Sequence, residues 1–252
     1  MDGTEGYDEA TYGDRIADIY DELPIHPTDG DAAAACLARL AGPGAALELA
    51  IGTGRVALPL ARLGVAISGI DVSEAMVAKL RAKPDGDRIP VTIGDFADVP
   101  VDGRYALIFV VYNTFFVLLD QARQRGCFQR VAEHLAPGGR FVVEAFVPDL
   151  TRFERHQHIE VRYVGVDAAM LSVSRHEPAT QRVQSLMVRL GAGGVQTWPV
   201  HLRYAWPSEL DLMAQLAGLR LEQRWGGWDG EPFTDDSVKH VSVYTADDGA
   251  EA

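Results

Sequence analysis

Apolar residues recur with two different spacings along the first 150 residues of the chain. Short, almost continuous apolar runs alternate with longer stretches in which apolar side chains return every three or four residues. The first pattern is typical of strands buried on both faces, and the second of helices with one apolar side. The predicted strands span residues 45–51, 65–71, 89–95, 105–113 and 140–147, and the predicted helices span 28–42, 55–64, 73–83 and 121–135. This alternation predicts a doubly wound α/β fold, with a mostly parallel sheet covered by helices on both faces.

The helical spacing ends after Pro148. The β-rich runs that follow span residues 158–166, 168–177, 181–190 and 194–206, with turn-forming residues between them. Such runs predict a small antiparallel sheet inserted into the α/β domain. The pattern ends with a helix at 208–218 and strands at 219–228 and 239–246, and we expect the tail after residue 246 to be disordered.

The charge balance narrows the classes of partner. The chain of 252 residues has 36 acidic and 23 basic residues, for a formal net charge of −13. A surface that follows phosphates needs a basic patch, so we expect no nucleic-acid partner and no anionic membrane partner. No apolar run approaches the roughly 20 residues that span a bilayer, and the acidic, polar first residues do not resemble a signal peptide. These features predict a cytoplasmic protein.

Cysteine usage agrees with a reducing compartment. Two cysteines, Cys36 and Cys127, are too few for a disulfide framework, and both lie in helical patterns. We therefore expect two buried thiols. No pair of histidines has convincing metal-ligand spacing, so we expect no metal.

The most informative stretch is Gly52-Thr53-Gly54, which joins a predicted strand to a predicted helix. Glycines at this junction allow the backbone to approach a nucleotide cofactor closely. With Ala57 in the third glycine position and Asp71 after the next strand, the pattern also fits dinucleotide-binding folds. The glycine pattern alone therefore does not distinguish NAD from S-adenosylmethionine.

Further motifs distinguish the two cofactors. Glu48-x-Ala50-x-Gly52-x-Gly54 resembles motif I of the class I S-adenosylmethionine-dependent methyltransferases, with Ala50 in place of the first glycine. The segments GIDVS (69–73), GDFADVP (94–100) and HLAPGGRFVVE (134–144) match later motifs of that family in the same order. The resemblance extends over residues 12–245 and implies a seven-stranded Rossmann-like sheet of order 3-2-1-4-5-7-6. It points to the small-molecule branch of the family.

The resemblance also implies a set of cofactor-binding residues. Asp71, followed by Val72, would accept the ribose hydroxyls, and Asp95 with Phe96 would meet the adenine. Glu48 would order the loop or reach the methionine amine. Tyr20 would reach the methionine carboxylate from an N-terminal segment that closes over the cofactor, with core packing as the alternative for this residue. The implied set comprises Tyr20, Glu48, Ala50, Gly52, Gly54, Arg55, Asp71, Val72, Asp95 and Phe96.

Two residues are candidates for catalysis. Methyl transfer needs a base only if the acceptor must lose a proton. Glu144 lies among apolar residues, where burial can raise the pKa of a carboxyl group, although a structural acid paired with an arginine explains it as well. His201 lies on the last strand of the insert and could act as a general base near neutral pH, although a lone strand histidine is more often merely exposed.

The organisation predicted from these features has three parts. Residues 1–27 form an N-terminal lid, residues 28–150 and 206–246 the cofactor-binding core, and residues 151–205 an inserted sheet over the acceptor site. An exposed edge of the insert would invite pairing, and a symmetric second copy is the usual cover, so we expect a homodimer.

The acceptor is expected to be a small organic molecule with an O, N or C nucleophile. Family branches that methylate amino groups of bases or glutamine often carry Asn-Pro-Pro-Tyr after the fourth strand, whereas this chain has Asn113-Thr114-Phe115-Phe116. The insert resembles that of sugar N-methyltransferases of natural-product pathways. Two alternatives stay open: an NAD(P)-dependent oxidoreductase, for which no hydride-transfer constellation is recognisable, and a non-catalytic S-adenosylmethionine-binding protein.

Overall fold

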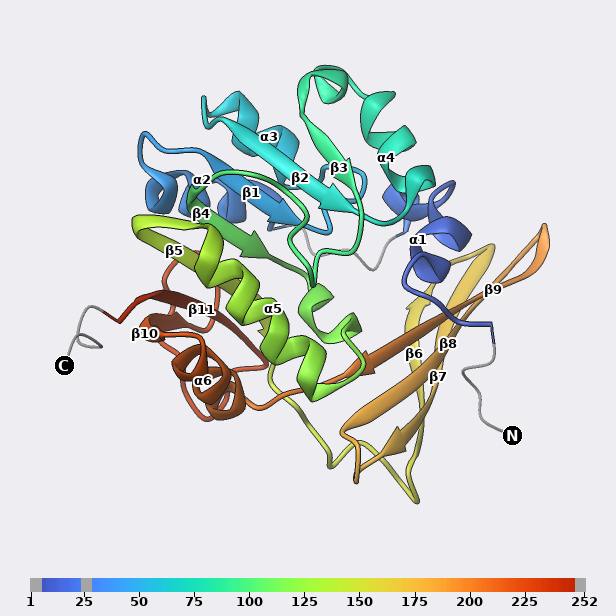
Figure 1. Cartoon of the computed structure of the whole chain (residues 1–252). Helices are drawn as coiled ribbons and strands as arrows, with labels where there is room; N and C mark the ends of the chain where they lie inside the picture. Colours follow the sequence, from blue (N-terminus) through green and yellow to red (C-terminus); the bar gives the residue numbers. More distant parts are fainter. Residues whose placement is uncertain (1–5, 24–28, 248–252) are drawn as a thin grey trace.

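The computed structural model describes residues 6–23 and 29–247. Its larger sheet has the strand order β10-β11-β5-β4-β1-β2-β3, and its smaller sheet has the order β6-β7-β8-β9 (Figure 1). The first five strands pair in parallel, and β11 lies antiparallel to both β5 and β10. The order 3-2-1-4-5-7-6 and the inserted antiparallel sheet are therefore confirmed.

The strands of the larger sheet are short and almost entirely buried at its centre. They are β1 (Ala46–Leu49), β2 (Ile67–Asp71), β3 (Val91–Ile93), β4 (Tyr105–Val110), β5 (Leu135–Phe146), β10 (Leu219–Trp225) and β11 (Lys239–Ala246). β5 begins earlier than predicted, because the Ala-Pro-Gly-Gly segment belongs to the strand and does not end the preceding helix. The pairing of β5 with β4 is irregular at this segment.

Helices cover the larger sheet on both faces. They are α2 (Gly30–Ala41), α3 (Ala57–Arg62), α4 (Glu74–Arg81), α5 (Gln121–His134) and α6 (Pro207–Leu216). Ser73, the first residue of the predicted helix 73–83, caps α4 by accepting a hydrogen bond from the backbone N–H of Met76 at 3.2 Å. Asp29 precedes α2 but makes no side-chain cap bond, and Thr28, where the predicted helix 28–42 begins, lies outside the described residues.

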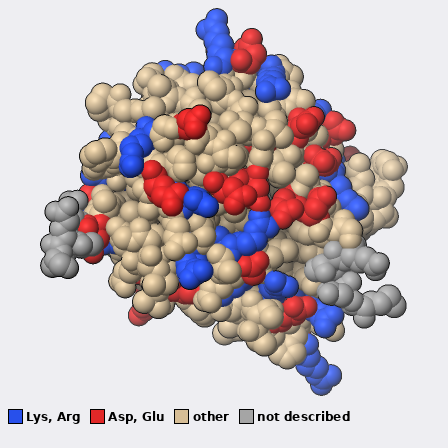
Figure 2. All heavy atoms as spheres, viewed as in Figure 1, with Lys and Arg blue, Asp and Glu red and all other residues tan. Residues whose placement is uncertain are grey.

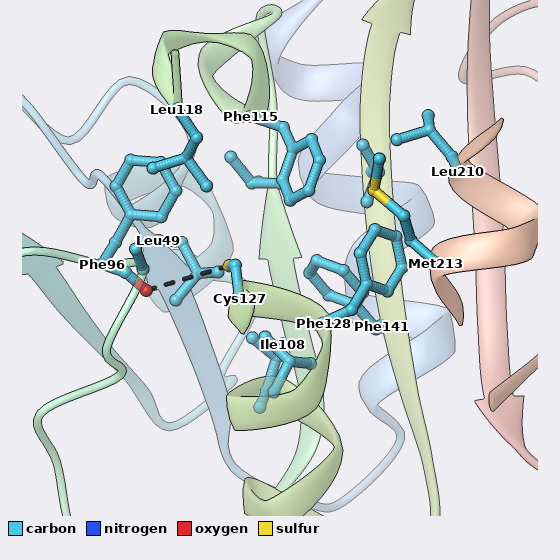
Figure 3. Close-up of a cluster of buried hydrophobic side chains, with 14 of the residues drawn as sticks. Leu49, Phe96, Ile108, Phe115, Leu118, Cys127, Phe128, Phe141, Leu210 and Met213 are labelled. Atoms are coloured by element: carbon cyan, nitrogen blue, oxygen red, sulfur yellow. Dashed lines mark hydrogen bonds between the residues drawn. The ribbon is translucent and has the colours of Figure 1, made fainter. Parts of the chain in front are cut away.

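Two apolar clusters separate these layers. α2 and α3 pack on one face of the sheet, and α5 and α6 pack on the other. Figure 3 shows the cluster beside α5 and α6, in which the labelled side chains of Phe128, Phe141 and Met213 lie close together. Cys127 lies in this cluster with its Sγ 4.0 Å from the Phe96 carbonyl oxygen, and Cys36 is buried in the other cluster. Both cysteines are free, as predicted.

The insert is a meander of four strands: β6 (Gln157–Val164), β7 (Ala168–Glu177), β8 (Arg182–Gly191) and β9 (Gly194–Arg203). One of its faces carries Met170, Met187 and Trp198, which pack against Ile16. Ile16 belongs to α1 (Thr11–Ile16), a short helix that the sequence pattern did not predict. The insert therefore packs against the N-terminal segment, and the two lie side by side in Figure 1.

Short 3-10 turns complete the chain: η1 (Tyr20–Glu22), η2 (Gly86–Arg88) and η3 (Thr114–Val117). η3 follows β4 and carries Phe115 and Phe116, both fully buried in the cluster beside α5. Two of the three positions that differ from the Asn-Pro-Pro-Tyr pattern, Phe115 and Phe116, are therefore packing positions in this chain. Of the predicted disordered tail, only Asp247 lies within the described residues, where its N–H donates to the Gly218 carbonyl.

Candidate functional site

The loop after β1 is built from left-handed backbone conformations. Ala50, Gly52 and Gly54 have φ angles of 57°, 55° and 77°. Gly54 also leaves no space for a side chain, because a Cβ atom there would lie 2.4 Å from Cδ1 of Leu80. Ala50 adopts a conformation that costs an L-residue about 1–2 kcal/mol. This backbone carries the loop around the carboxyl end of the sheet, where open α/β folds bind ligands.

Asp71 joins this loop to the end of β2. Its Oδ2 accepts a hydrogen bond from the Gly52 N–H at 2.7 Å, and its Oδ1 accepts one from the Ser73 N–H at 2.8 Å. The side chain is buried, and this burial raises the pKa of the carboxyl group. Asp71 is therefore held in a fixed orientation by two backbone donors, with lone pairs left over for a ligand.

Glu48 is a buried acid inside β1 and is 3% exposed. Its Oε2 has no hydrogen-bond partner among the described residues. Burial, together with the nearby Asp71, raises the pKa of Glu48 well above its usual range. A buried carboxylate oxygen without a partner is costly, and a cationic donor is the ligand group that would best relieve this cost.

Asp95 and Phe96 follow β3. Asp95 accepts a hydrogen bond from the Ala97 N–H at 2.9 Å and forms an ion pair with Arg123 of α5. Arg123 also pairs with Glu9 of the N-terminal segment. Phe96 is buried against the apolar cluster. Asp95 is thus linked through Arg123 both to α5 and to the N-terminal segment.

The N-terminal segment is attached to the same loops. The Ser73 hydroxyl donates to Asp14 at 2.6 Å, and the Thr53 hydroxyl donates to Asp21 at 2.7 Å. Asp21 also forms an ion pair with Lys83, whose Nζ lies 2.6 Å from Oδ2. Residues 6–23 therefore contact the loops after β1 and β2 directly, and they are linked to Asp95 after β3 through Arg123.

One cavity lies between the N-terminal segment and these loops, with about 980 Å³ of empty space that partly opens to solvent. All ten residues of the predicted cofactor set except Gly54 line it. The sequence motifs assign no cofactor-binding role to the other polar residues of the lining, which are Tyr7, Glu9, Tyr12, Thr53, Ser73, Tyr112 and Thr114. Among the described residues, the lining thus combines four tyrosines and four carboxylates with a single basic side chain, Arg55.

The tyrosines of the cavity stay neutral at physiological pH. Burial raises the pKa of Tyr20 to about 12 and raises the pKa values of Tyr7, Tyr12 and Tyr112 as well. Tyr112 stacks under Arg55, whose guanidinium carbon lies 4.1 Å from the ring centroid. Neutral aromatic rings beside carboxylates make a cavity that favours cations.

Neither candidate for catalysis belongs to the lining of this cavity among the described residues. The Glu144 carboxylate is 3% exposed and accepts hydrogen bonds from the Tyr112 N–H, Trp228 Nε1 and Lys239 Nζ. The basic partner of this acid is therefore a lysine, whereas the structural alternative anticipated an arginine. These contacts with buried neighbours are the ones expected if Glu144 has a structural role.

His201 is buried, at 7% exposure, and does not lie on an open strand face. Its ring stacks on Tyr7 with 4.1 Å between centroids, and burial lowers the pKa of the imidazole. In the strand register it shares a face of the insert with Gln184 and Arg175, opposite to the face that packs on α1. His201 thus contacts a cavity residue without lining the cavity.

Within residues 6–23 and 29–247, no group of three or more His, Cys, Asp or Glu side chains could hold a metal ion. No helix in this part of the chain is long and apolar enough to cross a membrane. On the face shown in Figure 2, Asp and Glu side chains form a band across the middle, with single Lys and Arg side chains between them.

Known proteins share both sequence and structure with this chain. Residues 46–139 match a family model described as a methyltransferase domain. A cypemycin N-terminal methyltransferase from Streptomyces sp. is 27% identical over 189 residues, covering 75% of this chain and 77% of the relative. The CcbJ methyltransferase from Streptomyces caelestis is 42% identical with a TM-score of 0.91, covering 95% of this chain and 99% of CcbJ. CalS10, an amino pentose methyltransferase from Micromonospora echinaspora whose structure contains S-adenosylmethionine, has the same fold at 19% identity, with a TM-score of 0.67 and coverage of 90% and 96%.

Proposed function

Since the chain belongs to the class I S-adenosylmethionine-dependent methyltransferases, we propose that it transfers a methyl group from S-adenosylmethionine to an amino group of a small organic molecule. The observation that carries the proposal is the cavity lined by tyrosines and carboxylates, with a buried oxygen of Glu48 that has no partner among the described residues.

The residues of the cavity fit the cofactor. S-adenosylmethionine supplies, when bound, a methyl group on a positively charged sulfur. In our proposal the free Glu48 oxygen accepts from the ammonium group, Asp71 accepts from the ribose hydroxyls, and Asp95 accepts from the adenine amine. The tyrosine rings surround the cationic part and exclude water from it. The protein would thus contribute alignment and dehydration.

The same lining argues against a dinucleotide. A pyrophosphate needs backbone N–H donors and basic groups at the glycine loop. Here Glu48 and Asp71 lie beside that loop, and Asp71 already occupies the Gly52 N–H. The occupied Gly52 N–H and the buried acid Glu48 therefore leave a pyrophosphate without the donors that it needs at this loop. An NAD(P)-dependent oxidoreductase therefore fits these residues poorly.

An amine is the acceptor that the cavity favours. Amines reach an acidic, aromatic cavity as cations and are attracted there, and their neutral fraction carries the attacking lone pair. Two of the relatives bear names that specify an amine acceptor or an amino sugar. Because neither Glu144 nor His201 lines the cavity, we assign no protein base to this step.

The decisive experiment combines binding with turnover. Calorimetry should show binding of S-adenosylmethionine and of its demethylated product, and no binding of NAD. A panel of amines, with matched alcohols in which the amino group is replaced, should then be methylated only at nitrogen. Binding of NAD alone would overturn the proposal, and binding of S-adenosylmethionine without any turnover would favour a non-catalytic binding protein.

Glu48 provides a prediction that couples stability to binding. A carboxyl group with a raised pKa in the folded state retains a proton that the unfolded chain has already lost. The free energy of unfolding therefore falls as the pH rises above the usual carboxyl pKa. Glu48→Gln should reduce this fall and stabilise the cofactor-free protein at neutral pH by about 1–3 kcal/mol. The same variant should bind S-adenosylmethionine ~10–100-fold more weakly, because it loses a charge-assisted hydrogen bond.

Thermal unfolding between about pH 5 and about pH 8, together with calorimetry, measures both effects. Glu133→Gln is a suitable control, because Glu133 is an exposed acid on α5 that pairs only with Arg130 of the same helix among the described residues. A Glu48 variant that is less stable than the wild type at neutral pH would contradict the assignment.

We also propose that the protein forms a homodimer through the insert. The strand register aligns Ile159, Val173, Leu186 and Pro199 in one row across the face that does not contact α1. Ile159, Val173 and Leu186 are 68%, 42% and 43% exposed. An apolar row across four strands, with a free edge at β6, favours a symmetric partner.

Light scattering at micromolar concentration should give the mass of a dimer, and Leu186→Lys should reduce it to that of a monomer. Val166→Lys is the matched control, since Val166 is fully exposed in the turn between β6 and β7 and outside the row. A monomeric mass for the unmodified protein would exclude the dimer.

We place this protein in the cytoplasm, in keeping with its two free cysteines.

A further inference from the structure

Tyr7 connects the insert to the cavity. It belongs to the N-terminal segment and lines the cavity, whereas no described residue of β6 to β9 does. Its ring stacks on the His201 imidazole of β9, with 4.1 Å between the centroids and 23° between the planes. The Tyr7 hydroxyl also accepts the backbone N–H of His201 at 3.4 Å. The insert thus covers one face of the Tyr7 ring, and a ligand in the cavity meets the other face or the edge.

The surroundings of this ring favour a cation. His201 is 7% exposed, and burial lowers the pKa of its imidazole, so the group behind Tyr7 is uncharged at neutral pH. Its Nδ1 is buried without a hydrogen-bond partner among the described residues. Burial, together with the charges of Asp8 and Glu9, raises the pKa of the Tyr7 phenol. A neutral ring pair beside two carboxylates attracts positive charge to its free side.

Tyr7 lies on a wall of the cavity to which no cofactor contact is assigned. The residues assigned to the cofactor come from β1 and the loops after β1, β2 and β3, apart from Tyr20 of η1. β9, on which Tyr7 stacks, also packs against η3, and η3 contributes Thr114 and Val117 to the lining. Tyr7 and η3 therefore border the part of the cavity that lies next to the insert.

We propose that the free side of the Tyr7 ring binds the acceptor amine beside η3, and that His201 is the positioning residue that holds this ring in place. An aromatic ring attracts an ammonium group that lies within about 6 Å of its centroid. The inference rests on the proposed function and extends it to two residues outside the cofactor motifs. It gives the insert a part in acceptor binding although its own strands do not line the cavity.

Ligand-observed NMR on the protein loaded with S-adenosylhomocysteine tests this contact without turnover. Piperidine is a protonated cyclic amine at neutral pH, and tetrahydropyran is a neutral ring of the same size. The wild type should bind piperidine more tightly than tetrahydropyran. Tyr7→Phe keeps the ring and should bind piperidine as the wild type does, whereas Tyr7→Leu should bind it about tenfold more weakly. Absence of piperidine binding to the wild type would overturn the inference.

His201 variants test the positioning role. His201→Phe keeps an aromatic ring that can stack on Tyr7, so its affinity for piperidine should remain close to that of the wild type. His201→Ala removes the stack and should show the same loss as Tyr7→Leu, and the double variant should be no weaker than Tyr7→Leu alone. Equal losses in His201→Phe and His201→Ala would contradict a role through stacking. Tyr163→Leu is the matched control, since Tyr163 is a 40% exposed tyrosine of β6 outside the cavity lining.

Calorimetry with S-adenosylhomocysteine separates the acceptor side of the cavity from the cofactor side. Tyr7→Leu should bind this ligand as the wild type does while losing affinity for piperidine. Equal losses for both ligands would assign Tyr7 to the cofactor and overturn the inference, as would no loss for either. If Tyr7→Leu does not fold, the comparison of His201→Ala with His201→Phe decides by the same criterion.

Turnover distinguishes failure of this inference from failure of the proposed function. For each amine that the wild type methylates, Tyr7→Leu should raise KM about tenfold with little change in kcat. An unchanged KM would overturn the inference and leave the proposed function standing. Tyr7-dependent binding of piperidine, without methylation of any amine, would support the inference and contradict the proposed methyl transfer.

Discussion

Asp71→Ala is expected to weaken the binding of S-adenosylmethionine by about 2–4 kcal/mol, roughly 30- to 700-fold. The family resemblance assigns this carboxylate to the ribose hydroxyls, and the structure places it, buried, in the lining of the cavity. The substitution also leaves the Gly52 and Ser73 N–H groups without their acceptor. We therefore expect the free energy of unfolding to fall as well, by about 1–3 kcal/mol.

Calorimetry measures the affinity, and denaturant unfolding measures the stability. Asp102→Ala removes the same charge from an exposed position after β3 and should change neither quantity. Asp71→Asn separates the two effects, because the amide oxygen can still accept one backbone N–H while the charge is lost. An Asp71→Ala protein that folds and binds S-adenosylmethionine normally would remove Asp71 from the site.

Gly52→Val is expected to abolish detectable binding. Gly52 has a φ of 55°, which a β-branched residue adopts only under strain, and it lines the cavity. A single added carbon would fit at this position, because a Cβ atom there would lie at an ordinary contact distance of 3.5 Å from Cε of Met76. The expected defect thus comes from the backbone conformation and from the two methyl groups in the cavity.

Gly52→Ala provides the graded comparison. Ala50, two residues away, already has a φ of 57°, so this loop tolerates an alanine in the left-handed region. We expect Gly52→Ala to lose about 1–2 kcal/mol of stability and to retain measurable binding. If Gly52→Val bound as well as Gly52→Ala, the loop would not approach the ligand. Thermal unfolding and calorimetry on both variants decide.

Local signals in the sequence were sufficient for the fold and the cofactor loops. Buried strands, the cap at Ser73 and the spaced glycines each depend on residues near one another in the chain, so their patterns are visible without the structure. The strand order was implied by the resemblance to the methyltransferase family, to which the ordered motifs and the two closing strands point. The positions that the resemblance assigned to the cofactor, from Glu48 to Phe96, lie together for the same reason, since parallel strands bring their carboxyl ends to one edge.

Only the tertiary structure decided the environments of Glu144, His201 and Tyr112. The donors that occupy the Glu144 carboxylate are 32, 84 and 95 residues away in the chain, and no local pattern indicates them. α1 has six residues, too few to be stable alone, and it forms against the insert, more than 150 residues later in the chain. Tyr112 shows an ordinary apolar strand end in the sequence, whereas its backbone adopts a left-handed φ of 56° beside the Glu144 carboxylate, which accepts its N–H. Such long-range contacts determine burial and polar partners, and these in turn determine whether a side chain packs in the core or faces the cavity.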